Sequence, residues 1–143
     1  MSSEFSWKVR VYYEDTDTGG VVFYANYLRF FERARTEWLR AAGVGQQLLS
    51  EKHRAMFVVK STTVDYHAPA KLDDELKLTV VVERLGRASV QFIQEAWRVD
   101  GTQPQLLTSG YIKVGCVDTE TLRPRPIPDE VMERIKRTGQ FPA

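Results

Sequence analysis

The chain of 143 residues has the length of one domain, and we expect residues 1–143 to form a single domain. A net charge of +1 gives no excess of positive charge for binding nucleic acid or an anionic membrane. With one cysteine, Cys116, an intrachain disulfide is excluded. There is neither a signal-peptide pattern nor a run of about 20 apolar residues, so we expect a cytoplasmic protein without a membrane span.

The first third of the chain predicts a strand, a loop and a long helix. Apolar and polar residues alternate over residues 5–13, which predicts a half-buried strand, and Gly19-Gly20 marks a loop over residues 14–24. From residue 26 to about 42 the apolar residues follow helical spacing. Asn26 is a candidate N-cap and Gly43 a candidate C′ residue. The apolar stripe consists of Tyr27, Phe30, Phe31, Ala34, Trp38, Ala41 and Ala42.

The rest of the chain reads as strands. We expect a short helical turn over residues 46–52, strands over 56–66, 75–84, 88–99 and 106–118, and a short helix over 129–137. In the third of these strands the apolar face shifts between Phe92 and Ile93, which predicts a bulge there. The short turns predict antiparallel pairs. The fold class is therefore α+β, with one five-stranded antiparallel sheet and one long helix in the order β-α-β-β-β-β. The helix covers one face, and apolar residues on the other face, such as Val81 and Trp97, predict self-association.

Three carboxylates crowd the loop before the long helix: Glu14, Asp15 and Asp17. A calcium loop starting at Asp15 fails because its twelfth position is Asn26, where a bidentate Glu is required. One cysteine and two distant histidines cannot build a zinc site. No nucleophile elbow or Gly-rich phosphate loop is present. We therefore expect no metal and no cofactor.

A carboxylate just before a helix start suits chemistry on a carbonyl. The free N–H groups at a helix start can polarise a carbonyl and stabilise an oxyanion. Asp17 could then attack the carbonyl as a nucleophile or activate a water as a general base. In the alternative interpretation Asp17 only caps the loop, and Glu14 and Asp15 are solvated. The residue types alone leave both interpretations open.

The segment YEDTDTGGVVFYANY, residues 13–27, resembles the active-site segment of hotdog-fold acyl-CoA thioesterases of the 4-hydroxybenzoyl-CoA thioesterase group. The resemblance is greatest to the branch associated with the Tol–Pal cell-envelope system. It continues through FFERARTEWLR in the helix and VDYHAPAKLDD at residues 64–74. The resemblance implies a sheet wrapped around the long helix.

The resemblance also implies site residues. Asp17 corresponds to the catalytic carboxylate, and the backbone around Tyr24 to the oxyanion-stabilising element. Many members of the Tol–Pal branch carry His in place of Tyr24, so the substrate and the mechanistic detail stay open. In the other interpretation Tyr24 contributes only to packing. His67 is either an exposed imidazole without a catalytic role or a general base. The implied substrate-binding residues are Gly20, Val21, Asn26 and Tyr27, with Tyr66 and His67 from a partner subunit, and Arg84 and Arg87 near the CoA phosphates.

The sequence therefore predicts an acyl-CoA thioesterase. The alternative is a non-enzymatic module that binds acyl-CoA or acyl-carrier protein, in which Asp17 is structural. A hotdog dehydratase fits less well because the Asp17 segment has no His. The expected partners are an acyl-CoA substrate, with acyl-carrier protein as the other thiol carrier, and further copies of the chain, as a homodimer at least and a homotetramer by resemblance. The acyl group is left open.

Overall fold

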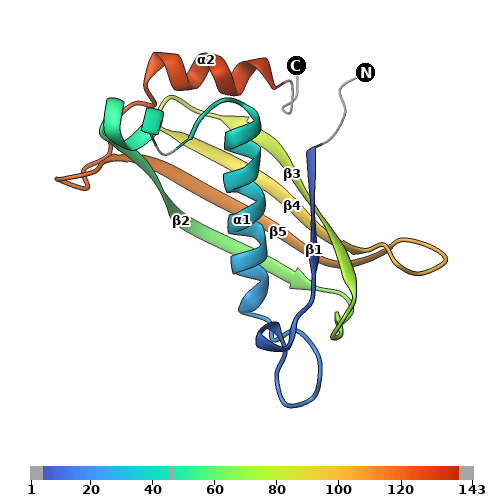
Figure 1. Cartoon of the computed structure of the whole chain (residues 1–143). Coiled ribbons are helices and arrows are strands. Elements are labelled where there is room, and N and C mark those ends of the chain that lie inside the picture. Colours follow the sequence, from blue (N-terminus) through green and yellow to red (C-terminus); the bar gives the residue numbers. More distant parts are fainter. Residues whose placement is uncertain (1–4, 46, 139–143) are drawn as a thin grey trace.

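The computed structural model describes residues 5–45 and 47–138 as a curved antiparallel sheet with a long helix across one face (Figure 1). The five strands are β1 (Phe5–Arg10), β2 (Ala55–Tyr66), β3 (Glu75–Leu85), β4 (Ser89–Arg98) and β5 (Gln105–Asp118). Their spatial order is β1-β3-β4-β5-β2, and each neighbouring pair is antiparallel. The predicted element order and sheet are confirmed.

The helix α1 (Asn26–Ala41) packs its aromatic side on the sheet. Its buried residues include Phe30, Phe31 and Trp38, each at most 1% exposed. Burying a side chain of this size stabilises a fold by about 1.5–3 kcal/mol. The predicted stripe is confirmed up to Trp38, but Ala41 is exposed because the chain leaves the helix there, and Val44 takes the buried place instead.

Two shorter helices close one end of the molecule. The π-helical turn η2 (Gln47–Lys52) follows α1, and the helix α2 (Asp129–Arg137) packs beside the end of α1 (Figure 1). Residue 46, where the predicted turn begins, lies outside the described residues. Gly43 has a φ of +86°, which confirms the predicted C′ residue.

Strand β4 keeps one inward face throughout, so the predicted bulge between Phe92 and Ile93 is wrong. Its buried residues are Val90, Phe92, Gln94 and Ala96, in strict alternation. The pattern looked broken because Gln94 is polar, yet its amide is fully buried and donates to the Phe31 carbonyl at 3.1 Å. The register shifts instead between Ala96 and Trp97 in the pairing with β5, and between Val82 and Arg84 of β3, opposite Phe92 and Gln91, in the pairing with β3.

Strand β2 forms one edge of the sheet and is long and exposed. It pairs with β5 on one side only, and residues 59–63 are all exposed. A long edge strand with unpaired backbone groups is a template for pairing with another strand. This edge therefore leaves a row of backbone groups available to a further strand.

Candidate active site

The loop between β1 and α1 is a compact unit that folds back on itself. The 3-10 turn η1 (Tyr13–Asp15) starts the loop. Thr16 then pairs with Val22, and the Asp17 amide donates to the Val21 carbonyl at 2.9 Å. Gly20, with a φ of +79°, makes the turn between them, a backbone conformation that glycine adopts without strain. This loop projects beyond the sheet at the end where α1 begins (Figure 1).

Asp17 lies on the outside of this loop. Its side chain is exposed, and its Oδ1 accepts a hydrogen bond from the Gly19 amide at 2.9 Å. Within the described part of the chain, its Oδ2 has no hydrogen-bond partner. One oxygen of the carboxylate thus orients the side chain, and the other is available to a proton or an electrophile.

Asp15, by contrast, is buried, and the expectation that it is solvated is wrong. It is 6% exposed. Its Oδ2 accepts from the Tyr12 amide and its Oδ1 from the Asn26 side-chain amide, both at 2.9 Å. Asn26 is therefore not the N-cap. It is the first residue of α1, after Ala25, and its side chain ties the loop to the helix start.

The helix start leaves backbone donors free. The amides of Asn26 and Tyr27 donate to the carbonyls of Phe23 and Tyr24, at 2.9 and 3.3 Å. The amides of Tyr24 and Ala25 have no acceptor among the residues that the structure describes. No side chain within residues 5–45 and 47–138 caps this end. Such free N–H groups, at the positive end of the helix dipole, are suited to binding a carbonyl oxygen that gains negative charge.

Three tyrosines gather beside this helix start. Tyr66, at the end of β2, donates from its Oη to the Tyr24 carbonyl at 2.9 Å. Its ring centroid lies 6.1 Å from that of Tyr24 and 5.7 Å from that of Tyr27. Burial raises the pKa of Tyr27, and burial together with the neighbouring phenols raises that of Tyr66, so both stay protonated at neutral pH. Tyr24 itself is 70% exposed.

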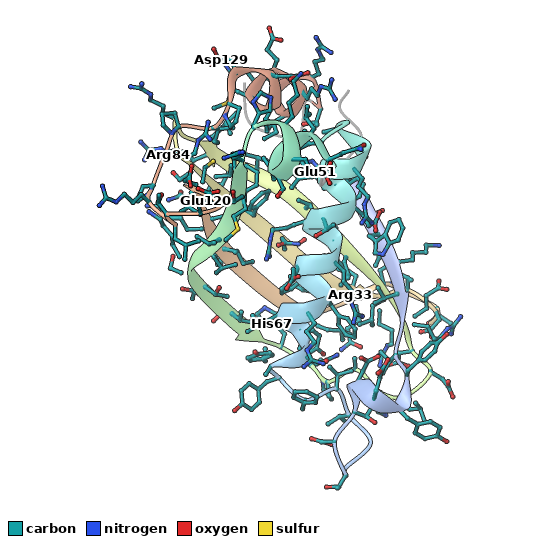
Figure 2. The ribbon with its side chains drawn as sticks, turned by 60° about the vertical axis from the view of Figure 1, so that its left-hand side comes forward. Arg33, Glu51, His67, Arg84, Glu120 and Asp129 are labelled. Carbon is teal, nitrogen blue, oxygen red and sulfur yellow. The ribbon has the colours of Figure 1, made fainter. Side chains whose placement is uncertain are left out.

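Some of the other predicted residues lie in this site, and others lie next to it. Gly20 and Val21 contact the segment at residues 70–72, since Leu72 donates to the Gly20 carbonyl at 3.4 Å and Val21 pairs with Lys71. Asn26 and Tyr27 are buried, at 1% and 2% exposure. His67 lies at the same end of the molecule (Figure 2), but its Nε2 contacts the Ser109 hydroxyl at 3.0 Å.

A thioesterase-like superfamily profile matches residues 11–135. This chain belongs to the thioesterase-like superfamily. It is 45% identical over 131 residues to an acyl-CoA thioesterase, YbgC, of Haemophilus influenzae, covering 92% of this chain and 93% of that protein. It is 43% identical over 133 residues to the acyl-CoA thioester hydrolase YbgC of Escherichia coli, covering 93% and 96%. A crystal structure of a probable thioesterase from Bartonella henselae matches at 31% identity with a TM-score of 0.80, covering 88% of this chain and 100% of that one.

The predicted family and the hotdog fold are thereby confirmed, and with them, at the level of the family, the prediction of a thioester hydrolase. Among the described residues, no helix is long and apolar enough to cross a membrane. No group of three or more potential metal-binding side chains occurs within residues 5–45 and 47–138.

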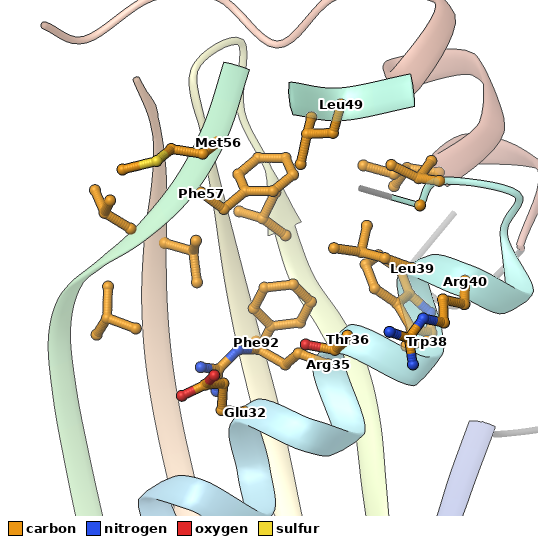
Figure 3. Close-up of a pocket in the computed structure, with 17 residues that line it drawn as sticks. Glu32, Arg35, Thr36, Trp38, Leu39, Arg40, Leu49, Met56, Phe57 and Phe92 are labelled. Atoms are coloured by element: carbon orange, nitrogen blue, oxygen red, sulfur yellow. The ribbon is translucent and has the colours of Figure 1, made fainter. Parts of the chain in front are cut away.

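One feature of this thioesterase-like chain was not predicted. A cavity of about 500 Å³ lies along the second half of α1, between that helix, β2 and η2 (Figure 3). Pockets of roughly 300–1,000 Å³ are typical of small-molecule sites. Its residues come from six elements that are far apart in sequence. The apolar patterns of these elements predict that their side chains are buried, but they do not predict that a cavity remains between the elements.

Proposed function

We propose that this chain is an acyl-CoA thioesterase in which Asp17 is the catalytic carboxylate. The observation that carries the proposal is that this one loop holds a carboxylate oxygen of Asp17 and, at the start of α1, two backbone amides, all without a hydrogen-bond partner among the described residues. Two contacts support their closeness. Asp17 bonds to Val21, three residues before Tyr24, and Asp15 is anchored to Asn26.

In the proposed reaction the thioester carbonyl oxygen accepts hydrogen bonds from the amides of Tyr24 and Ala25. As general base, Asp17 takes a proton from water while the water oxygen bonds to the carbonyl carbon. The C–S bond then breaks, and the proton on Asp17 returns to the departing CoA thiolate. As nucleophile, Asp17 would form an anhydride with release of the thiolate, and water would then hydrolyse the anhydride. Reaction in ¹⁸O water under single turnover tests for the nucleophilic route, because ¹⁸O enters Asp17 only when water attacks the aspartyl carbonyl of the anhydride.

Tyr24 contributes its backbone amide to this site, and its exposed ring covers the thioester. Gly20 and Val21 give the chain close approach to the substrate, while the buried Asn26 and Tyr27 hold the helix start from behind. Tyr66 and His67 of a second copy would line the acyl group. The exposed edge of β2 supports such an assembly, as a homodimer and by resemblance a homotetramer. Acyl-carrier protein as a second thiol carrier, a cytoplasmic location and a place beside the Tol–Pal system belong to the proposal through resemblance alone.

The decisive experiment measures thiol release from a panel of acyl-CoA esters by the wild type and by Asp17→Asn. General acid–base groups contribute about 10²–10⁴-fold to rate, so we expect kcat to fall at least ~10²-fold with an unchanged unfolding curve. Near-wild-type turnover in the variant would reject the role of Asp17.

The second candidate is a binding module without hydrolysis. The bond from the Gly19 amide to Asp17 favours it, because that bond gives the carboxylate a purely structural use. Tight binding of acyl-CoA esters without thiol release, at every chain length, would establish the module and exclude the enzyme.

A further inference from the structure

The cavity along α1 has mostly apolar walls, and its polar side chains come from the helix itself. Leu39, Leu49 and Phe57 contribute to its apolar wall, and Glu32, Arg35 and Arg40 to its polar part (Figure 3). A purely hydrocarbon ligand would leave these polar groups unused.

Arg35 is held in place but lacks a matching anion. Its Nη1 donates to Gln94 Oε1 at 2.8 Å, and Gln94 is in turn fixed by its bond to the Phe31 carbonyl. Throughout the described residues, no carboxylate oxygen lies within 4 Å of its guanidinium. Burial lowers the pKa of Arg35 to about 10, and the negative charge of Glu32, one turn earlier, only partly opposes this. The group remains a cation at neutral pH, with reduced hydration and free donors.

Trp38 does not add a donor to the cavity. Its side chain is 1% exposed, and its indole Nε1, which has no hydrogen-bond partner among the described residues, is shielded from the cavity space. Arg40 differs from Arg35, because its guanidinium already pairs with Glu37 at 2.6 Å. The cavity thus combines apolar walls with one cation, Arg35, that lacks a matching anion.

The cavity lies at a defined distance from the proposed reaction site. Glu32 and Arg35 follow Asn26 by six and nine residues, which places them roughly 9–14 Å along the helix axis. Both sites lie beside α1 and β2: Tyr66, at the end of β2, bonds to the Tyr24 carbonyl, and Phe57, near the start of β2, lines the cavity. A substrate held by its thioester at the helix start could therefore extend its far end toward Arg35.

We propose that Arg35 is a specificity-determining residue, which selects acyl groups whose far end carries a carboxylate over plain hydrocarbon chains. The proposal rests on the proposed thioesterase function. The carboxylate would accept from the free guanidinium donors of Arg35, and the apolar walls would cover the methylene chain between the two ends. Glu32 would oppose such a substrate by charge repulsion.

The test compares kcat/KM for matched pairs of CoA esters: adipoyl with hexanoyl, suberoyl with octanoyl, and sebacoyl with decanoyl. We expect the wild type to favour the carboxylate member of a pair long enough to reach Arg35. Hydrogen bonds to charged groups contribute about 1.5–3 kcal/mol, so Arg35→Met should lower that ratio roughly tenfold to hundredfold. Glu32→Gln should raise it.

The matched control is Arg33→Met, which removes a charge from an exposed position of α1 outside the cavity and should leave the ratio unchanged. Arg35→Lys keeps the positive charge, so it should recover part of the ratio. Such recovery would show that the loss in Arg35→Met comes from the missing charge and not from misfolding. A wild type that hydrolyses the plain esters but shows no carboxylate preference, or an Arg35→Met ratio equal to that of the wild type, refutes the role of Arg35 alone. Hydrolysis of neither series refutes the thioesterase function as well.

Discussion

Replacing Asp15 by alanine should destabilise the fold strongly, although Asp15 lies only two residues from the proposed catalytic Asp17. The carboxylate accepts two hydrogen bonds, from Tyr12 N and Asn26 Nδ2, and Asn26 is 1% exposed. Leaving a buried donor unsatisfied costs about 1–3 kcal/mol. Because Tyr12 is exposed, water can reach its amide, so losing that bond adds only about 1 kcal/mol and we expect a total loss of about 2–4 kcal/mol. That is a large part of a typical stability of 5–15 kcal/mol, and it should lower Tm by roughly 10 °C.

The assay is urea unfolding followed by tryptophan fluorescence and circular dichroism, with Asp17→Asn as the control. An exposed substitution should change stability by no more than about 0.5 kcal/mol. We therefore expect stability to fall in the Asp15 variant and activity to fall in the Asp17 variant. Combining Asp15→Asn with Asn26→Asp should recover part of the pair energy in a double-mutant cycle. Asp15→Ala with wild-type stability would refute the assignment of Asp15 as the anchor of the helix start.

Two further predictions concern stability. Hydrogen bonds from Lys52 and His53 hold the pKa of Glu130 at about 2, below its ordinary value of 4.5, so its contribution is complete above about pH 4.5 and is lost as the pH falls toward 2. Glu130→Gln should flatten that part of an acid-unfolding curve, and an unchanged curve would contradict the bonds. A Cβ on Gly110 would lie 3.0 Å from Phe31 Cε2, so Gly110→Ala should cost about 1–3 kcal/mol in chemical denaturation; a more stable variant would contradict the tight packing.

The elements were predictable because their periodicity is strong. The stripe from Tyr27 to Trp38 and the alternation in β3 report burial directly, and the predicted helix at residues 129–137 has the bounds of α2. Gln94 shows the limit of this reasoning. A buried amide reads as a polar interruption of an apolar face, because its partners Phe31 and Arg35 lie about 60 positions away in sequence.

The conformation of the loop that carries the candidate site was less predictable than the helices and strands. The spacing of apolar residues predicts which side chains are buried only in regular helices and strands. Asp15 and Asp17 lie in a 3-10 turn and a loop instead. Which of the two turns inward depends on Asn26, eleven residues after Asp15. Two like charges this close together repel each other. The motif DxDxxG could therefore have suggested that its two carboxylates have different surroundings and different roles.

The three acidic side chains of this loop differ in whether a carboxylate oxygen is oriented and free to take part in catalysis. Both oxygens of Asp15 are occupied by donors, so protonating or alkylating it would break the anchor of α1. Glu14 is exposed and has no hydrogen bond that fixes its carboxylate within the described chain. Asp17 alone combines one oxygen that fixes its orientation with one that is free. A catalytic base needs both, because a fixed direction gives the geometry of proton transfer and a free lone pair accepts the proton. The buried neighbour makes this possible, because Asp15 holds the loop against the helix start and Asp17 is not needed for that contact.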